Sequence, residues 1–388
     1  MKILSVFNMA QDAYNVTLAL RKMGADASLM IIEGSDVFST PAWEDGAVNG
    51  NVGDPLKPNQ ESLKNWRRPD WIIPYPKHKG LKYIKGLKYI RFIKELKNLR
   101  LIAKRFDVAF CHASGIRYGP TLGVPYIPYD AGMIRYLSMG GEPMNPTVGR
   151  IGKISEWAYE RSYRKAKNII FTNPDTYSRL REAKLQEKLV FCPFAIDIEK
   201  YKPIETEPNS RFMVFSPTRQ NWGEKGNNRL FNGFKQFLGW ESEARLILTE
   251  WGQNIDLSKD YINKIGIAEN TSWVKPMPKP QLVRMYNQAD IVADQFNLGC
   301  WGTTTPEAMS CGKPVLMHYS KEDIHRCFGS LPPFESVQGS GEIASQMIRY
   351  LEKSERNKIG QACREWAIKT HSPEIAAKIH LRVAEEAN

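Results

Sequence analysis

Short apolar runs alternate with amphipathic stretches along most of this chain, and that alternation constrains its fold more than any other sequence feature. The first third reads as a strand over 2–7, a helix over 10–23 and a strand over 27–32. Further strand patterns lie at 107–111, 124–128, 168–172 and 188–192, with a helical pattern at 151–165. A strand–helix–strand order predicts a parallel sheet with right-handed crossovers.

The alternation restarts after a polar, Pro-rich stretch at 202–209 that reads as a linker. The strand patterns of this second part lie at 212–216, 245–249, 271–274, 290–293 and 314–317. Its helical patterns lie at 226–238, 281–288 and 304–311, and three more close the chain. We therefore predict two doubly wound α/β domains, 1–203 and 204–371, with residues of about 372–388 packing back on the first. Ligands of such sheets bind at the carboxyl ends of the strands, which favours the cleft between the domains.

Composition excludes several classes of protein. With 42% hydrophobic and 25% charged residues, the chain has the material for packed cores and is not a disordered chain. Its six cysteines form no C-x-x-C pair and are too sparse for a disulfide scaffold, so we interpret them as reduced thiols of a cytosolic protein. No apolar run approaches the ~18–20 residues of a membrane span. The opening residues read as a strand rather than a signal peptide.

Positive charge is concentrated in one segment. Residues 77–105 contain eleven Lys and Arg residues against Glu95, which is +10 of the chain's net +12. We expect a helix over about 88–104, and its aromatic, Leu and Ile residues beside the cations suit an anionic lipid surface. The predicted membrane contacts are Lys82, Lys85, Lys88 and Arg91. The alternative is a solvated helix whose apolar positions pack inward.

Residues 33–76 lose periodicity and are rich in Gly, Pro, Asn and Trp. A loop of this length either covers a functional site or is an insertion that packs on the surface. Nothing in the sequence separates these two interpretations.

The stretch 289–318 carries the most informative chemistry. A strand ends near Asp294, and a loop containing Gly299 and Gly302 leads into a helix that begins at Thr303 and Thr304. Free backbone N–H groups and the helix dipole at such a point suit a phosphate. Glu307 lies in the first turn, where a carboxylate can accept the two hydroxyls of a ribose. The alternative is capping alone, with Glu307 closing a capping box.

A second group of cations follows the strand at 212–216. Arg219 and Lys225 lie on the loop that leads into the helix at 226–238. Two cations at the carboxyl end of a strand can neutralise a diphosphate, because Arg offers a planar fork and Lys a point charge. Taken alone, two loop cations are more often ordinary surface residues.

Several of these stretches together resemble the retaining glycosyltransferases of family 4, the glycosyl transferases group 1, which have the GT-B fold. The segment PTRQNWGEKG (217–226) matches the family's Arg and Lys six residues apart, and EAMSCGKPV (307–315) matches its later motif. CPFAIDIEKYKP (192–203), NQADIVADQ (287–295) and REWAIKTHSP (364–373) also look like the family. The motifs occur in the family's order. The expected architecture is therefore GT-B, two Rossmann-like domains facing across a cleft.

The resemblance implies a nucleotide-sugar donor on the second domain. Arg219 and Lys225 would hold the diphosphate and stabilise the leaving group. The backbone of Gly302, Thr303 and Thr304 would reach a phosphate, Glu307 would hold the ribose, and the base would lie near Gly252 and the turn at Pro278. No cofactor and no bound metal are expected, and the absence of a D-x-D motif or a His/Cys cluster agrees. Gly299 stands where the family has a sugar-binding Glu, so the sugar is open. Gln295 or Asn297 could supply replacement contacts.

On the acceptor side, His112 and Asp130 follow strands of the first domain and are expected to face the cleft. Asp130 occupies a position where the family often has a residue near the reacting sugar. Each is a candidate catalytic residue or a structural residue with its hydrogen bonds satisfied.

Together these features predict a sugar transferase, retaining as the resemblance implies, peripheral at the cytoplasmic face of a membrane. Its acceptor would be a lipid-linked sugar, a glycolipid or a polysaccharide. A soluble acceptor is a second enzyme hypothesis. Another class is a polyanion- or nucleic-acid-binding protein, which the pI of about 9.3 allows but which leaves the ordered motifs unexplained. A third is an inactive sugar-binding protein, suggested by Gly299.

Overall fold

The computed structural model describes residues 1–48, 58, 66–76, 96–139, 153–207 and 209–388. These residues form two compact units. The first unit contains Met1–Trp43, Ala47–Ala195 and Pro373–Asn388, and the second contains Glu44–Gly46 and Ile196–Ser372. The chain thus passes into the second unit after Ala195, earlier than the boundary predicted at 203/204, and its last residues return to the first unit.

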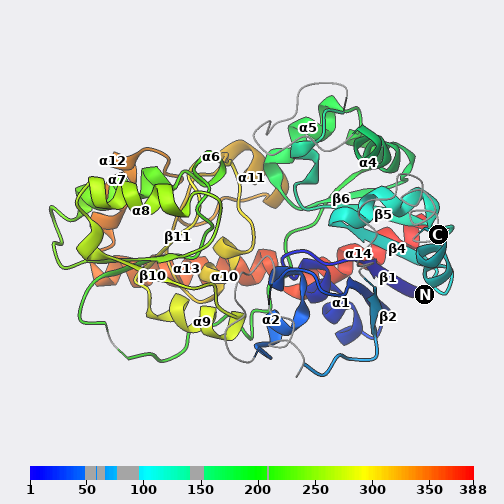
Figure 1. Cartoon of the computed structure of the whole chain (residues 1–388), viewed down its shortest axis with the longest axis horizontal. Coiled ribbons are helices and arrows are strands. Elements are labelled where there is room, and N and C mark those ends of the chain that lie inside the picture. The colour runs from blue at the N-terminus through cyan, green and yellow to red at the C-terminus, as the bar shows by residue number, and fades with distance from the viewer. Residues whose placement is uncertain (49–57, 59–65, 77–95, 140–152, 208) are drawn as a thin grey trace, which may run out of the picture. The chain divides into compact units, whose positions relative to one another are not determined.

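The first unit is built on a parallel sheet with the order β3-β2-β1-β4-β5-β6-β7 (Figure 1). Its strands are β1 (Lys2–Val6), β2 (Asp26–Ile32), β3 (Ile72–Tyr75), β4 (Val108–His112), β5 (Tyr126–Asp130), β6 (Ile169–Phe171) and β7 (Leu189–Phe191). All but β3 were predicted. β3 lies in the stretch 33–76, where Pro74 interrupts a strand of only four residues.

Helices cover both faces of this sheet. On one face, α1 (Asp12–Lys22) and α14 (Pro373–Ala387) pack on apolar side chains of β1, β4 and β5. On the other, α4 (Lys153–Lys165) contacts β5 through Tyr126 and Asp130, which alternate with the first face along the strand. The remaining elements are η1 (Val37–Ser39), α2 (Pro41–Asp45), η3 (Ala113–Thr121), η4 (Met133–Tyr136), η5 (Pro174–Thr176), α5 (Tyr177–Glu182) and η6 (Gln186–Lys188).

The second unit repeats the design with a smaller parallel sheet in the order β10-β9-β8-β11-β12. Its strands are β8 (Met213–Ser216), β9 (Arg245–Thr249), β10 (Thr271–Val274), β11 (Ile291–Ala293) and β12 (Val315–Leu316). These five strands were all predicted. The two parallel sheets confirm the predicted α/β class with doubly wound topology.

Helices α7, α8 and α12 cover one face of the second sheet, and α9, α10 and α13 lie on the other (Figure 1). The core beneath α7, α8 and α12 contains Phe231, Phe234 and Phe237 of α7, each fully buried. Burial of each side chain stabilises the fold by roughly 1.5–3 kcal/mol. The helices are α6 (Trp222–Lys225), α7 (Asn227–Phe237), α8 (Ile255–Lys264), η7 (Ala268–Asn270), α9 (Lys279–Gln288), α10 (Thr304–Ser310), α11 (Lys321–Phe328), α12 (Ser340–Arg349) and α13 (Lys353–His371).

Two helix predictions for this part of the chain were wrong. Helix α8 was not predicted, because its Asp, Ser, Lys and Asn residues mask the buried Ile262 and Ser258 on its inner face. Four helices rather than three follow β12, since α11 is a separate short helix capped by Ser320. The predicted helix at 88–104 is described only from residue 96, and residues 96–103 are helical.

Candidate active site

Both sheets reverse their winding direction at their first strand. In the second unit β8 lies between β9 and β11, and in the first unit β1 lies between β2 and β4. Loops at the carboxyl ends of strands that flank such a switch point diverge and leave room for a ligand. In the second unit these loops are 217–226 and 294–303, and they contain the predicted residues Arg219, Lys225, Gly299 and Gly302.

The two loops of the second unit are fastened to each other by Asn297. Its Nδ2 donates to the carbonyl oxygens of Trp222 and Gly223, at 2.9 and 3.0 Å. Gly226 has a φ of 64°, and a Cβ there would lie 2.8 Å from Asn297 Oδ1. The tight approach explains why glycine follows Lys225, and it shows that Asn297 positions the first loop.

Arg219 is held by a buried carboxylate. Its guanidinium forms an ion pair with Glu224, whose side chain is only 4% exposed, while that of Arg219 is 38% exposed. Asn221 donates from Nδ2 to the same Glu224 oxygen at 3.2 Å and caps α6 by accepting from Glu224 N. Glu224 therefore fixes the orientation of the Arg219 side chain, and part of that side chain remains exposed to solvent.

Lys225 points to the second loop. Its Nζ donates to Gln295 Oε1 at 2.6 Å. Burial lowers the pKa of Lys225, and the nearby carboxylate of Asp294 opposes that shift. Within the described part of the chain Lys225 forms no ion pair, so its charge is balanced only at longer range. Asp294 is itself engaged, since its Oδ2 accepts from Thr305 Oγ1 at 2.8 Å.

Helix α10 begins at Thr304, but not by the predicted capping. Thr303 is the N-cap residue with helical dihedrals, φ −79° and ψ −22°, and its side chain makes no cap hydrogen bond. Glu307 closes no capping box, so that alternative was wrong. The physical reason is that the carboxylate of Glu307 is drawn toward α9 by a cation.

Glu307 lies at the centre of a buried network. Its Oε1 accepts from Lys279 Nζ at 2.5 Å, and its Oε2 accepts from the Tyr286 hydroxyl at 3.0 Å. Burial raises the pKa of Glu307, and Lys279 acts against that rise. A carboxylate has about four acceptor sites, so two remain for the hydroxyls of a ribose. The predicted ribose contact stays a prediction.

Sequence reasoning missed the partners that set these orientations. Lys279 and Tyr286 lie on α9, 28 and 21 positions before Glu307, and nothing in that spacing marks them. Glu224 did carry a signal, because an acidic residue directly before Lys225 lies within reach of Arg219. The ion pairs between these cations and carboxylates can be identified only in the folded chain.

The structure places Gly252 against the first loop. Its φ is 110°, and a Cβ would lie 2.6 Å from both the backbone N and O of Gln220. The neighbouring Trp251 accepts from Gln220 N at 2.7 Å and donates from Nε1 to the Pro217 carbonyl at 3.2 Å. Gly252 thus lies beside the loop that carries Arg219, and its place near the base stays a prediction.

The other donor-side positions are backbone sites. Pro278 caps α9 and accepts from Gln281 N at 3.0 Å. The carbonyl of Gly299 accepts from Ser320 N at 2.8 Å. A Cβ on Gly302 would meet nothing within 4 Å, so open space borders this residue beside Thr303. Their contacts with a ligand stay predictions.

A substitution at Gly252 tests the close approach. We expect Gly252→Ala to lower the free energy of unfolding by about 2–3 kcal/mol, because it combines backbone strain with a clash against Gln220. Gly266→Ala is the matched control: its φ is 76° and its Cβ would meet nothing, so only about 1 kcal/mol is expected. Urea denaturation measures both, and equal losses would contradict the close packing.

In the first unit, the loop after β1 contains non-glycine residues with positive φ angles. Phe7, Ala10 and Gln11 have φ values of 68°, 52° and 63°. The buried side chain of Gln11 anchors the following segment, since its Nε2 donates to the carbonyls of Phe38 and Thr40 at 2.8 and 2.9 Å. Strained non-glycine residues cluster at functional loops more often than elsewhere.

His112 ends β4 at the switch point of the first sheet. It is 3% exposed, and its ring lies 4.2 Å from that of Tyr129. Burial lowers its pKa well below the ordinary value, so the imidazole is neutral. Neither ring nitrogen has a hydrogen-bond partner among the described residues. The catalytic role of His112 stays a prediction.

Asp130 differs from His112 because its carboxylate accepts hydrogen bonds from other residues of the first unit. It is fully buried and accepts from Gly132 N, Ile134 N and the Tyr163 hydroxyl at 2.5, 3.1 and 2.6 Å. Its catalytic role stays a prediction. These bonds fold the start of η4 onto α4, which favours the structural alternative stated above.

The last observations concern the predicted membrane contacts, metal binding and membrane-spanning helices. Lys82, Lys85, Lys88 and Arg91 lie outside the described residues. Among the described residues, no three His, Cys, Asp or Glu side chains are grouped as a metal site. The described helices include none with the length and apolar character needed to cross a bilayer.

Residues 197–322 match the family described as glycosyl transferases group 1. This match confirms the resemblance inferred from the motifs, and the second unit therefore carries a group 1 glycosyltransferase domain. A D-inositol 3-phosphate glycosyltransferase from Segniliparus rotundus is 23% identical over 143 residues, which are 34% of this chain. The match spans 31% of that relative's length.

Solved structures of GT-B glycosyltransferases resemble the whole chain. Anabaena HepE in complex with UDP and glucose has a TM-score of 0.69 and 14% identity, covering 100% of this chain and 99% of HepE. Sucrose-phosphate synthase from Thermosynechococcus elongatus has a TM-score of 0.70 and 12% identity, with the same coverage. These likenesses confirm the GT-B fold.

Proposed function

We propose that this chain, whose residues 197–322 carry a group 1 glycosyltransferase domain, transfers a sugar from a nucleotide-sugar donor to an acceptor at a membrane surface. The observation that carries the proposal is the pair of cations Arg219 and Lys225 at the switch point of the second sheet. The acceptor would be lipid-linked, a glycolipid or a polysaccharide chain. The HepE complex with UDP and glucose makes UDP-sugars the first donors to test.

Arg219 and Lys225 would bind the donor diphosphate. When the bond from the sugar to the phosphate breaks, negative charge grows on the leaving diphosphate, and preorganised cations stabilise that charge most in the transition state. Glu224 and Gln295 hold the two side chains in place before the donor arrives. Thus less reorganisation is needed at the moment of reaction.

The rest of the donor would lie along the same loops. Glu307 would accept the ribose hydroxyls with its two remaining acceptor sites, while Lys279 opposes the rise of its pKa that burial causes. The base would lie near Gly252 and Pro278, and Gly302 to Thr304 would face a phosphate. Transfer with retention is carried from the family, and the departing phosphate can take the acceptor's proton, so neither a separate base nor a metal is required.

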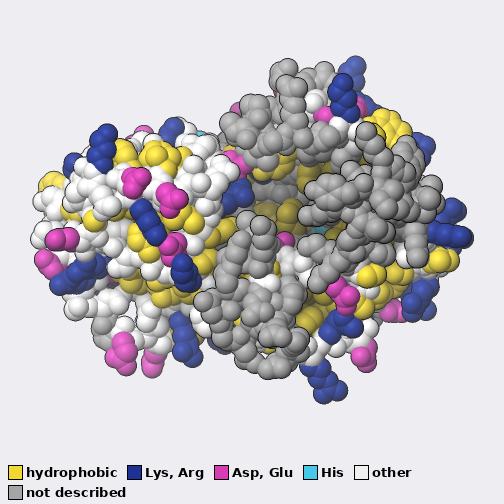
Figure 2. Space-filling model, viewed as in Figure 1, with side chains coloured by type: hydrophobic (Ala, Val, Ile, Leu, Met, Phe, Trp, Pro, Cys, Tyr) yellow, Lys and Arg dark blue, Asp and Glu magenta, His cyan; other side chains and the backbone are white. Residues whose placement is uncertain are grey.

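The acceptor would bind the first unit near the neutral imidazole of His112. The basic segment 77–105 would hold the enzyme against anionic lipid at the cytoplasmic face of the membrane. A nucleic-acid partner is not expected. Figure 2 shows Lys and Arg interspersed with Asp and Glu over α7, α8 and α12, which is unlike a continuous polyanion-binding face.

Calorimetric titration with UDP, GDP, ADP, CMP and dTDP tests the donor site. One nucleotide is expected to bind the wild-type protein, and the variant Arg219→Ala/Lys225→Ala should bind it at least about a hundredfold more weakly, because two charge-assisted contacts are lost. If the variant binds as tightly as wild type, the diphosphate site is elsewhere. If no nucleotide binds at all, the polyanion hypothesis gains.

A further inference from the structure

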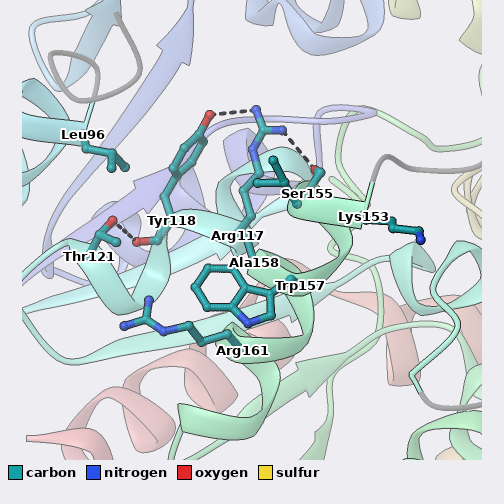
Figure 3. Close-up of a pocket in the computed structure, with 10 residues that line it drawn as sticks. Leu96, Arg117, Tyr118, Thr121, Lys153, Ser155, Trp157, Ala158 and Arg161 are labelled. Carbon is teal, nitrogen blue, oxygen red and sulfur yellow. Dashed lines mark hydrogen bonds between the residues drawn. The ribbon is translucent and has the colours of Figure 1, made fainter. Parts of the chain in front are cut away.

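The first unit contains a pocket of about 960 Å³ that the proposed donor chemistry does not use (Figure 3). It lies between η3 and α4 and extends to Leu96, at the start of the described helix 96–103. Its size is near the upper end of ordinary ligand pockets. All its described lining residues belong to the first unit, so it is a feature of that unit alone.

The apolar part of the pocket is unusually exposed. On α4, Ile154 is 77% and Trp157 61% exposed, and the two residues are one helical turn apart. Leu96 and Ala158 extend this apolar lining. Large apolar side chains that gather at a pocket without being covered mark an interaction site more often than chance exposure does. Trp is also the side chain that best suits the boundary between water and hydrocarbon.

Cations border the same pocket. Arg117, Lys153 and Arg161 line it, and no Asp or Glu is among its described lining residues. Within the described part of the chain none of the three forms an ion pair. An anionic group that entered here would therefore meet uncompensated positive charge.

The two arginines are preorganised by neutral partners. Arg117 donates to the Tyr118 hydroxyl at 2.7 Å and to Ser155 Oγ at 3.4 Å, and its guanidinium lies 4.7 Å from the Tyr118 ring centroid. Arg161 lies 5.6 Å from the Trp157 ring centroid. Figure 3 shows Arg117 and Arg161 reaching the pocket from η3 and α4. These contacts orient both guanidinium groups without neutralising them.

From this combination we infer that the pocket binds one anionic membrane lipid, with its phosphate at Arg117 and its hydrocarbon chain along Trp157 and Ile154. A neutral sugar would leave the cations of the lining without an anionic partner, and a nucleotide would leave the apolar face formed by Leu96, Ile154 and Ala158 unfilled. A folded polyanion would contact an open surface rather than enter a pocket. The inference deepens the proposed function, on which it rests for the membrane setting, and adds a lipid site to which the basic segment 77–105 contributes only Leu96 among the described lining residues.

The decisive probe is dodecyl phosphate in its monomeric form, titrated calorimetrically into the full chain, with inorganic phosphate and dodecyl maltoside in parallel. We expect one dodecyl phosphate to bind per chain, while inorganic phosphate and the neutral amphiphile bind much more weakly. The variant Arg117→Gln/Arg161→Gln should weaken binding roughly tenfold or more, because the cation at the phosphate and a second cation of the lining are lost. Trp157→Ala should weaken it by a similar factor.

Matched controls are available in the same chain. Arg164 is on α4 but is paired with Glu160, and Trp240 is a 71% exposed tryptophan of the second unit. Arg164→Gln and Trp240→Ala should bind dodecyl phosphate like wild type. The inference is overturned if the pocket variants also bind like wild type.

Vesicles of phosphatidylcholine with and without phosphatidylglycerol then test the bilayer as the source of the lipid. Sedimentation should be stronger with the anionic lipid and weaker for the pocket variants. Nucleotide titration of the same preparations separates the two proposals. Intact nucleotide binding with no dodecyl phosphate binding refutes the lipid pocket alone, and the reverse result refutes the donor site alone.

Discussion

Replacing both Arg219 and Lys225 by Ala is expected to lower kcat for sugar transfer by about 10⁴-fold or more, since removing a single preorganised donor from a developing anion costs about 10²–10³-fold. Both side chains are oriented before the donor binds, by Glu224 and by Gln295. The measurement is the rate of nucleoside diphosphate release at saturating donor. A loss confined to KM would mean that the two cations bind ground and transition states equally.

Two further variants make that result interpretable. Arg219→Ala alone leaves the buried Glu224 carboxylate without its cation, so part of its effect would be structural. Arg219→Gln/Glu224→Gln removes both charges and should fold normally while remaining nearly inactive. Arg326→Ala removes a surface cation that pairs with Glu322 and Asp323 on α11, and it should retain wild-type activity.

The second large effect is on stability, at the buried pair of Lys279 and Glu307. Their side chains are 12% and 4% exposed, and the ammonium and carboxylate lie 2.5 Å apart. Lys279→Met is expected to lower the free energy of unfolding by about 3–5 kcal/mol near neutral pH, because it leaves a buried carboxylate without its cation. Lys279→Met/Glu307→Gln should recover most of that loss.

The pH dependence of Lys279→Met follows from the raised pKa of Glu307. Burial and the like charge of Glu44 already raise that pKa, and Lys279 opposes them. Without Lys279 the folded-state pKa rises further above the unfolded value, so the folded variant binds a proton more tightly than the unfolded chain. The stability that this proton adds to the folded Lys279→Met variant is present below the unfolded pKa of about 4.3. It is lost as pH rises through the folded-state pKa of Glu307.

Urea denaturation as a function of pH measures this dependence against the double variant. An exposed pair supplies the control: Lys321 and Glu335 are 60% and 59% exposed at 3.3 Å, and Lys321→Met should change stability by less than about 1 kcal/mol. A Lys279→Met protein as stable as wild type at neutral pH would contradict the buried-pair interpretation.

The sequence was sufficient for the layout of both sheets, because buried parallel strands leave continuous apolar runs between amphipathic helices. It failed at β3, where Pro74 and a length of four residues leave no period to detect. It also failed at α8, whose sequence is polar except for one narrow stripe. In each case packing against neighbouring elements decides the structure, and local residue pattern does not.

The sequence predicted the donor-side residues of the site better than the acceptor-side residues. Arg219 and Lys225 lie on the loop that the motif indicated, because strand ends position loops regardless of detail. For Asp130 the sequence left a catalytic and a structural role open, since its three hydrogen bonds come from residues up to 33 positions away. The partners of Glu307 were missed for the same reason, as α9 and α10 meet only in the folded unit.

The measurement that tests the central claim most directly is nucleoside diphosphate release from a panel of UDP-, GDP-, ADP- and dTDP-sugars, with a membrane lipid extract as the source of acceptor. The account predicts that one nucleotide-sugar is consumed, that the extract stimulates its consumption, and that Arg219→Gln/Glu224→Gln abolishes it. Binding of a nucleotide-sugar without any turnover would contradict the account and identify an inactive sugar-binding protein on the same fold.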